Sequence, residues 1–314
     1  MLGVFLDTDT MQPDALDFAG LEASLPEWRL YRQSAPGEVA ERIRDATVVV
    51  TNKVVLDRAL LRSAKSLRLV CVCATGMNNV DLQAAAEQGI PVRNVTDYAG
   101  PSVAQHTLAL MLGLATNWHE YHGDVQAGEW SRSPMFCLMH RPVIELAGKT
   151  LGIIGYGVLG RAVASLAQAF GMRVLVAESL RGDAQPDPQR VPLEKLLAEA
   201  DVVSLHCPLN EGTRNLISRE ALVVMKPGAF LINTARGGLV DEQALADALR
   251  NGEIAGAALD VLSQEPPAQD HVLLAADIPN LILTPHNAWV SRECRQRLLD
   301  GVLKNIQDWK ASSV

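Results

Sequence analysis

The chain has no apolar run approaching the roughly 18 residues that a membrane-spanning helix needs, and it has no cluster of basic residues. A membrane span is therefore not expected. The 28 basic and 36 acidic residues give a net charge of −8, which argues against nucleic acid or an anionic membrane as a partner because both attract clustered Lys and Arg. The opening stretch MLGVFLDTDTMQPD has no basic residue before its apolar ones, so a secretory signal is not expected either.

Cysteines are few, and none forms a CxxC pair: Cys71, Cys73, Cys137, Cys207 and Cys294. The first two lie within the apolar run LRLVCVCA, which is typical of reduced core thiols. We therefore expect a cytoplasmic protein without a disulfide framework or a zinc site. His119 and His122, in HEYH, could share a helix face, but no third ligand is evident and no metal is predicted.

Short β-branched runs alternate with helical patterns along most of the chain. GVFLDT, ATVVVTN, RLVCVCA and PVRNV predict strands in the first hundred residues. KTLGIIG, RVLVAES, DVVSLHC, AFLINTA, GAALDVL and NLILTP predict a second series. Segments such as LDRALLRSAK, RAVASLAQAF and EQALADALRNG have apolar residues at helical spacing. Such alternation predicts an α/β fold of doubly wound parallel sheets with helices on both faces.

At 314 residues the chain is long enough for two domains, and we predict that the second is inserted in the first. The first would comprise residues 1–98 and 288–314, and the inserted one residues 99–287. A long helical pattern, SVAQHTLALMLGLATNWHEYH, follows the first crossing and is introduced by Gly100-Pro101. Ligands of such sheets bind outside the carboxyl ends of the strands, and often between domains.

The stretch GYGVLG, residues 155–160, is a G-x-G-x-x-G motif between a predicted strand and a predicted helix. Gly155 would allow the tight turn, Gly157 would let a pyrophosphate approach the backbone, and Gly160 would let helix and strand pack closely. Free N–H groups at the start of the helix would face the phosphates. The alternatives are a glycine-rich turn without a ligand, and a methyltransferase that shares the fold and binds another nucleotide.

The next predicted strand, RVLVAES, ends at Glu178, near the distance expected for the acid that accepts hydrogen bonds from the ribose hydroxyls. A carboxylate there would repel a 2′-phosphate, which favours NAD over NADP as the cofactor. Arg181 nearby could weaken that preference.

Three later strands are followed by polar residues that folding does not require. Arg236 follows AFLINTA, Glu265 follows GAALDVL, and His286 follows NLILTP. Neighbouring parallel strands would bring all three side chains to one edge of the sheet. Asp260 is a further polar residue, within the apolar run GAALDVL.

Together, these three residues could catalyse hydride transfer to a 2-oxo acid. An arginine fork can hold a 2-oxo acid by its carboxylate and polarise its carbonyl. A histidine can deliver a proton as hydride arrives and take it back in the oxidation direction. A carboxylate on the far ring nitrogen fixes the tautomer and favours the imidazolium. Taken singly, the residues could also be a surface arginine, a loop glutamate and a capping histidine.

Together with these residues, six stretches resemble the D-isomer-specific 2-hydroxyacid dehydrogenase family over nearly the whole chain. They are SVAQHTLALML, ELAGKTLGIIGYGVLG, HCPLNEGTRNLI, MKPGAFLINTARGGLVDEQAL, GAALDVLSQEPP and LTPHNAWVSRE. The resemblance implies two Rossmann-like domains, NAD as the cofactor, a small 2-oxo or 2-hydroxy acid as the substrate, and a homodimer formed through the helix near residues 101–122.

The resemblance also implies roles for individual residues. Arg236, Glu265 and His286 would be catalytic. The substrate would be bound by Arg236 and His286 and by a loop of four residues, Ala74, Thr75, Gly76 and Met77. Cofactor binding falls on Gly155, Gly157, Val158, Leu159, Gly160, Glu178, Cys207, Pro208, Thr213, Thr234, Ala235, Arg236, Asp260, His286 and Ala288. Of these, Asp260 would hold the nicotinamide carboxamide.

Within the family, TNKVVLD, ATGMNNVDL and HNAWVSREC are most similar to NAD-dependent glycerate dehydrogenases, also called hydroxypyruvate reductases. Hydroxypyruvate and glyoxylate are therefore the leading substrates. The sequence departs from the usual pattern at Glu178, Gln105 and HVLLA (residues 271–275), and at Met77 and Asn287, which would border the substrate. Alternatives are a larger 2-oxo acid substrate and an NAD(H)-sensing, corepressor-like scaffold.

Overall fold

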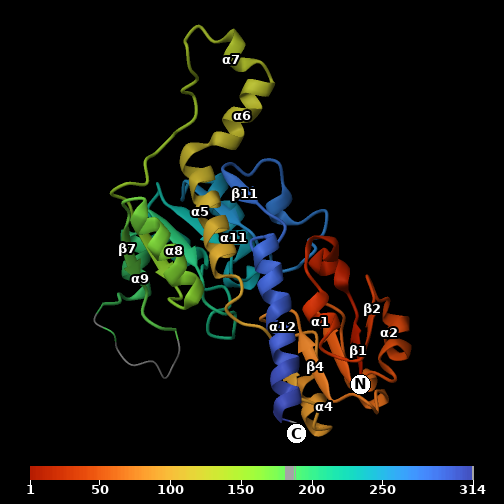
Figure 1. Cartoon of the computed structure of the whole chain (residues 1–314). Helices are drawn as coiled ribbons and strands as arrows, with labels where there is room; N and C mark the ends of the chain where they lie inside the picture. Colours follow the sequence, from red (N-terminus) through yellow and green to blue (C-terminus); the bar gives the residue numbers. More distant parts are fainter. Residues whose placement is uncertain (181–186, 188, 313–314) are drawn as a thin grey trace. The chain divides into compact units, whose positions relative to one another are not determined.

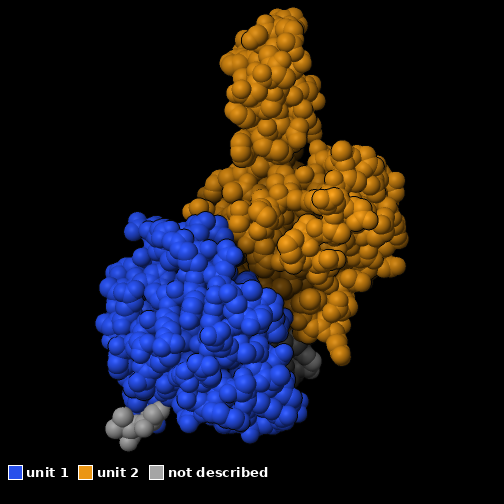
Figure 2. Space-filling view, turned by 90° about the vertical axis from the view of Figure 1, so that its right-hand side faces the viewer, with its two compact units in different colours: residues 1–99, 289–314 blue, residues 100–288 orange. Residues whose placement is uncertain are grey.

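The computed structural model describes residues 1–180, 187 and 189–312. The chain divides into two compact units, which are coloured separately in Figure 2. Unit 1 comprises Met1–Ala99 and Trp289–Val314, and unit 2 comprises Gly100–Ala288. Each unit is built on a parallel sheet covered by helices, so the predicted fold class is confirmed (Figure 1).

Unit 1 contains a five-stranded parallel sheet in the order β2-β1-β3-β4-β5. The strands are β1 (Leu2–Phe5), β2 (Glu27–Leu30), β3 (Val48–Thr51), β4 (Leu69–Val72) and β5 (Val92–Arg93). One face packs against α2 (Pro36–Ile43), α3 (Arg58–Ser63) and α4 (Leu82–Glu87), and the other against α1 (Ala19–Glu22) and α12 (Arg292–Ser312). The sequence did not predict β2, because EWRL is an edge strand that is largely exposed and carries little apolar pattern.

Unit 2 contains a six-stranded parallel sheet in the order β11-β10-β9-β8-β6-β7. Its strands are β6 (Thr150–Ile154), β7 (Arg173–Val176), β8 (Val202–Leu205), β9 (Phe230–Asn233), β10 (Gly256–Leu259) and β11 (Leu281–Leu283). Ile153 packs on the face covered by α5 (Gly100–Thr116) and α8 (Val158–Ala169). Its neighbour Ile154 packs on the opposite face, under α9 (Leu193–Glu199), α10 (Arg219–Val224) and α11 (Glu242–Arg250). Successive strand residues thus serve both cores, which explains the continuous apolar runs.

Three boundaries differ from the sequence prediction. The long helix expected near residues 101–122 is broken at Asn117, whose φ of 49° is left-handed and interrupts the helical backbone. β7 ends at Val176, two residues before Glu178. β10 ends at Leu259, so Asp260 follows the strand instead of lying within it.

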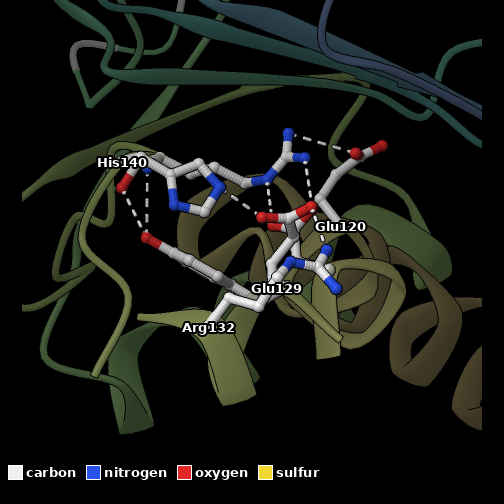
Figure 3. A network of polar contacts seen from close by, with 7 residues as sticks. Glu120, Glu129, Arg132 and His140 are labelled. Atoms are coloured by element: carbon white, nitrogen blue, oxygen red, sulfur yellow. Dashed lines mark hydrogen bonds and ion pairs between the residues drawn. The ribbon is translucent and has the colours of Figure 1, made fainter. Parts of the chain in front are cut away.

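Beyond the break, residues 117–143 form an arm that projects from unit 2 and includes α6 (Trp118–Gln126) and α7 (Glu129–Arg132) (Figures 1 and 2). A polar network ties α6 to the returning chain (Figure 3). Arg141 donates to both carboxylate oxygens of Asp124, at 2.9 and 3.0 Å, and lies 3.1 Å from Glu120. His140 Nε2 lies 3.0 Å from Asp124 Oδ2. The hydrogen bond from Arg141 lowers the pKa of Asp124, so this carboxyl group stays ionised.

The arm exposes several large apolar side chains. Phe136, which follows α7, is 90% exposed. Others that are at least half exposed are Trp118, Trp130, Met135, Met139 and Val143. Several large apolar side chains exposed on one projecting element are more than the scattered single residues that an ordinary surface carries.

No helix in the described part of the chain combines the length and apolarity that crossing a membrane would need. All five cysteines are free. Burial raises the pKa of the Cys71 thiol to about 12, so that thiol stays protonated and packs as an apolar side chain.

Candidate active site

The carboxyl edge of the unit 2 sheet holds the three residues to which the sequence assigns catalysis. β10 pairs with β9 and with β11 over its last residues, so the three strands end in register. Arg236, Glu265 and His286 follow these ends by three, six and three residues. All three segments therefore leave the sheet at the same edge, where parallel α/β sheets bind their ligands.

His286 and Glu265 are in direct contact. The ring Nδ1 lies 2.6 Å from Glu265 Oε2, and the two side chains are 39% and 35% exposed. Glu265 Oε1 accepts a hydrogen bond from the backbone N–H of Leu262 at 2.9 Å, so both carboxylate oxygens are engaged. Because Nδ1 is held by the carboxylate, Nε2 is the ring nitrogen that can exchange a proton with a ligand.

The backbone of His286 is held in an uncommon conformation. Its φ of 52° is in the left-handed region, which non-glycine residues seldom occupy. Its N–H donates to the backbone carbonyl of Asp260 at 2.7 Å. A backbone outlier that is fixed by neighbouring groups is typical of functional sites.

Asp260 organises the segment that carries this histidine. The side chain is 1% exposed. It accepts hydrogen bonds from Thr284 Oγ1 at 2.6 Å and from the N–H groups of Asn287 and Ala288 at 2.9 Å each. Burial alone would raise the pKa of Asp260, but hydrogen bonds from His106, Thr284 and these N–H groups outweigh it and hold the pKa below its ordinary value of 3.8. Contact between Asp260 and a nicotinamide carboxamide stays a prediction, since its oxygens already accept from the chain's own donors.

Arg236 begins the turn after β9 and is exposed. Its guanidinium Nη1 donates to the carbonyl of Ala235 at 2.7 Å, and its own carbonyl accepts from Asn233 Nδ2 at 2.9 Å. The structure therefore joins His286 and Glu265 directly and places Arg236 at the same sheet edge with a local hydrogen bond of its own.

The glycine motif forms the turn between β6 and α8. Gly155 has a φ of 96°, and a Cβ there would lie 2.5 Å from the backbone nitrogen of Cys207. A Cβ at Gly160 would lie 2.1 Å from the carbonyl oxygen of Gly155. Both glycines are thus required by the protein's own packing. A Cβ at Gly157 would meet no atom within 4 Å, so the backbone there faces open space at the N-terminus of a 12-residue helix. The residues present therefore fit a pyrophosphate, and with it a dinucleotide.

Glu178 is exposed beyond the end of β7, and its backbone N–H donates to the carbonyl of Val191 at 2.8 Å. A carboxylate at that position remains accessible to a ligand. Arg181, expected to modulate the coenzyme preference, lies outside the described residues.

Several other predicted cofactor residues have identifiable structural contacts. The buried Thr213 hydroxyl donates to the Pro208 carbonyl at 2.8 Å and accepts from the Asn210 N–H at 2.8 Å, which closes the loop after β8. Thr234 Oγ1 lies 3.0 Å from Thr107 Oγ1 of α5. Val158 and Leu159 form the first turn of α8.

The loop formed by Ala74, Thr75, Gly76 and Met77 belongs to unit 1, where it follows β4. The Val95 N–H donates to the Ala74 carbonyl at 3.2 Å, and Asn94 Nδ2 donates to the Thr75 carbonyl at 2.6 Å. These bonds fix the first half of the loop against the segment after β5.

The sequence alone did not point to His106. Its Nε2 lies 3.0 Å from Thr284 Oγ1 and 3.4 Å from Asp260 Oδ1, so α5 contributes to the support of the His286 segment. The only signal was a polar residue inside the apolar helix SVAQHTLALML.

Comparison with known proteins identifies the family of this chain. The family profile described as "D-isomer specific 2-hydroxyacid dehydrogenase, NAD binding domain" matches residues 108–288. A glycerate dehydrogenase of Methylorubrum extorquens is 42% identical, with 98% of this chain and 96% of that protein covered. A hydroxypyruvate reductase of Blautia hydrogenotrophica is 40% identical, with 99% and 97% covered.

Among solved structures, the pyruvate reductase of Chlamydomonas reinhardtii is similar, with a TM-score of 0.85, 27% identity, and 99% of this chain and 97% of that chain covered. The profile match spans more than half of this chain, and the relatives span nearly all of it. The resemblance predicted from the sequence is confirmed, and the chain belongs to the D-isomer-specific 2-hydroxyacid dehydrogenase family of oxidoreductases.

Proposed function

We propose that this chain reduces short 2-oxo acids, foremost hydroxypyruvate and glyoxylate, to the D-2-hydroxy acids with NADH, and that it runs the reverse reaction as well. The hydrogen bond of 2.6 Å between His286 Nδ1 and Glu265 Oε2 carries this proposal, because it creates an oriented acid/base group on a sheet that also holds a dinucleotide cradle. The names of the two relatives at 42% and 40% identity support the choice of substrates.

Each residue of the trio has its own task in this reaction. Bound NADH supplies the hydride that forms the new C–H bond. Arg236 holds the substrate carboxylate and polarises the carbonyl through its planar fork. His286 Nε2 donates its proton to the carbonyl oxygen and recovers it during oxidation. Glu265 fixes the ring and stabilises its protonated form.

We assign nucleotide binding to unit 2 and the backbone contacts of the substrate carboxylate to residues 74–77 of unit 1. We further propose a preference for NAD over NADP, because the exposed Glu178 carboxylate would accept hydrogen bonds from ribose hydroxyls and repel a 2′-phosphate.

We also propose that the protein is a homodimer. The sequence predicted a contact through the helix near residues 101–122, but many residues of α5 are buried in the core of unit 2. We therefore assign the contact with a second copy of the chain to the arm, residues 117–143. Its exposed apolar residues, Phe136 above all, support this assignment. Sedimentation of the full chain and of Phe136→Glu would test it. We expect a dimer that the substitution weakens, and a wild-type monomer at micromolar concentration would contradict the assignment.

The decisive test of the activity is a panel of 2-oxo acids of increasing size offered with NADH and, separately, with NADPH. The loss of reduced-nicotinamide absorbance should be fastest with NADH and hydroxypyruvate or glyoxylate. A larger acid as the best substrate would overturn the proposed specificity. NADH that binds but is oxidised by no acid in the panel would instead favour the scaffold.

A further inference from the structure

A second polar cluster in unit 2 contacts the loop that carries Glu265. It joins Glu242, in the first turn of α11, to Ser263 and His271. Glu242 Oε1 accepts from the Ser263 N–H at 2.7 Å, and Oε2 accepts from the Ser263 hydroxyl and lies 3.2 Å from His271 Nε2. The side chains of Glu242 and His271 are only 12% and 11% exposed. A carboxylate that receives three donors at such burial is held in one position.

The geometry of His271 makes it a donor to Glu242. Its Nδ1 accepts a hydrogen bond from the Leu273 N–H at 3.3 Å, so the ring proton is on Nε2, which faces Glu242. This histidine belongs to HVLLA, one of the stretches in which the sequence departs from the family pattern. Its partner, Glu242, is 29 residues away in sequence, so the contact between the two forms only in the folded protein.

The cluster is hydrogen-bonded to the loop that carries Glu265. Ser263 is two residues before Glu265, and two hydrogen bonds anchor the loop at this point. The Leu262 N–H is held by Glu265 Oε1, and the Ser263 N–H is held by Glu242. The same loop packs against the turn after Arg236, since a Cβ at Gly237 would lie 1.9 Å from the carbonyl carbon of Leu262.

We propose that Glu242, with His271 and Ser263, is a positioning residue that holds the Glu265 carboxylate against His286 Nδ1 and keeps the adjoining turn of Arg236 in place. This inference rests on the proposed function of the trio, and it adds a support that acts through the loop without touching the substrate. The segment of His286 has separate support: Asp260 and His106 contact Thr284, and Asp260 also accepts from the N–H groups of Asn287 and Ala288.

The test combines histidine NMR with kinetics on the full-length chain. The titration of His286 is followed without coenzyme or substrate and assigned with His286→Gln. Glu242→Gln removes at least one of the three acceptor interactions and the charge, whereas Glu242→Asp keeps the charge and shortens the side chain. Glu220→Gln is the matched control, since Glu220 also lies in the first turn of a unit 2 helix and accepts from a serine hydroxyl, Ser218, at 2.6 Å.

We expect Glu242→Gln and Glu242→Asp to move the His286 titration in the same direction as Glu265→Gln, because each change weakens the contact between the ring and the Glu265 carboxylate. We also expect both to lower kcat for reduction, by up to about a hundredfold, because a small misplacement of a catalytic group is costly. Glu220→Gln should match the wild type in the His286 titration, in kcat and in the dissociation constant for NADH.

A wild-type titration of His286 and an unchanged kcat in Glu242→Gln would overturn the inference. Wild-type behaviour of Glu242→Asp would overturn it too, because it would assign the effect to charge instead of contact. If the Glu242 variants do not fold, Ser263→Ala, which removes one hydroxyl, should give the same shift at smaller size, and no shift would refute the inference. The NMR titration needs no turnover, so a wild type that is inactive on every 2-oxo acid would refute the proposed function separately.

Discussion

Replacing Asp260 by Asn should destabilise unit 2 and disorder the segment of residues 284–288, which carries His286. The wild-type carboxylate accepts from Thr284 Oγ1 and from the N–H groups of Asn287 and Ala288, which approach different oxygens. An amide has only one oxygen, so its NH₂ group would face a donor in a site that is 1% exposed. The chain would thus lose a charge-assisted hydrogen bond and bury an unsatisfied donor.

The expected cost follows from those two effects. A hydrogen bond to a charged group contributes about 1.5–3 kcal/mol, and an unsatisfied buried group costs about 1–3 kcal/mol. Since the effects overlap, we expect a loss of about 2–4 kcal/mol in the free energy of unfolding. For a unit of this size that corresponds to a fall in Tm of roughly 10 °C.

The loss should depend on pH with a definite sign. The pKa of Asp260 is lowered in the folded state, so its stabilisation is present in full above the unfolded value of 3.8 and disappears as the pH falls through the folded value. The difference in stability between wild type and Asp260→Asn should therefore be constant near neutral pH and shrink in acid.

Thermal and urea unfolding followed by circular dichroism would measure the difference, with Asp277→Asn as the control. Asp277 forms an ion pair with Arg250 at 2.8 Å but its side chain is 66% exposed, so its replacement should change Tm far less. Equal Tm values for Asp260→Asn and the wild type, or a difference that grows in acid, would refute this account of Asp260.

Four further substitutions test other parts of the site. Gly157→Ala should leave Tm unchanged, because its Cβ meets open space, yet weaken NADH binding in a fluorescence titration; Gly155→Ala should lower Tm, because its Cβ would clash with the backbone of His206 and Cys207. Arg236→Lys should raise KM for the 2-oxo acid and lower kcat, since an ammonium lacks the planar fork, and unchanged kinetics would contradict that role. Glu178→Gln should lower the ratio of kcat/KM with NADH to that with NADPH, and an unaltered ratio would remove Glu178 from coenzyme selection.

Features that depend on local pattern could be predicted from the sequence. The apolar runs gave most strands, because strands buried on both faces admit few polar residues. GYGVLG lies between a strand and a helix as predicted. Gly155 has a φ of 96°, and Gly160 lies against the carbonyl of Gly155, five residues earlier in the motif, whereas Gly157 faces open space. The ends of three parallel strands located Arg236, Glu265 and His286 at one edge because strand register is common to the sheet.

Features that depend on contacts between distant residues could not be predicted. The left-handed Asn117 ends α5 inside a continuous helical pattern, and no glycine or proline marks the break. The Glu242–His271 contact joins residues 29 positions apart. The hydrogen bonds of Asp260 with residues 284–288 depend on the pairing of β10 and β11. The sequence alone shows only an isolated acidic residue next to a predicted strand.

The most direct measurement is the rate of hydroxypyruvate reduction by His286→Ala under saturating NADH, alongside the variant's affinity for NADH. We expect kcat to fall by about a hundred- to ten-thousandfold, far more than any change in NADH affinity, because the ring is the proton donor. A variant that turns over hydroxypyruvate at nearly the wild-type rate would contradict the assignment of His286 as the acid/base group.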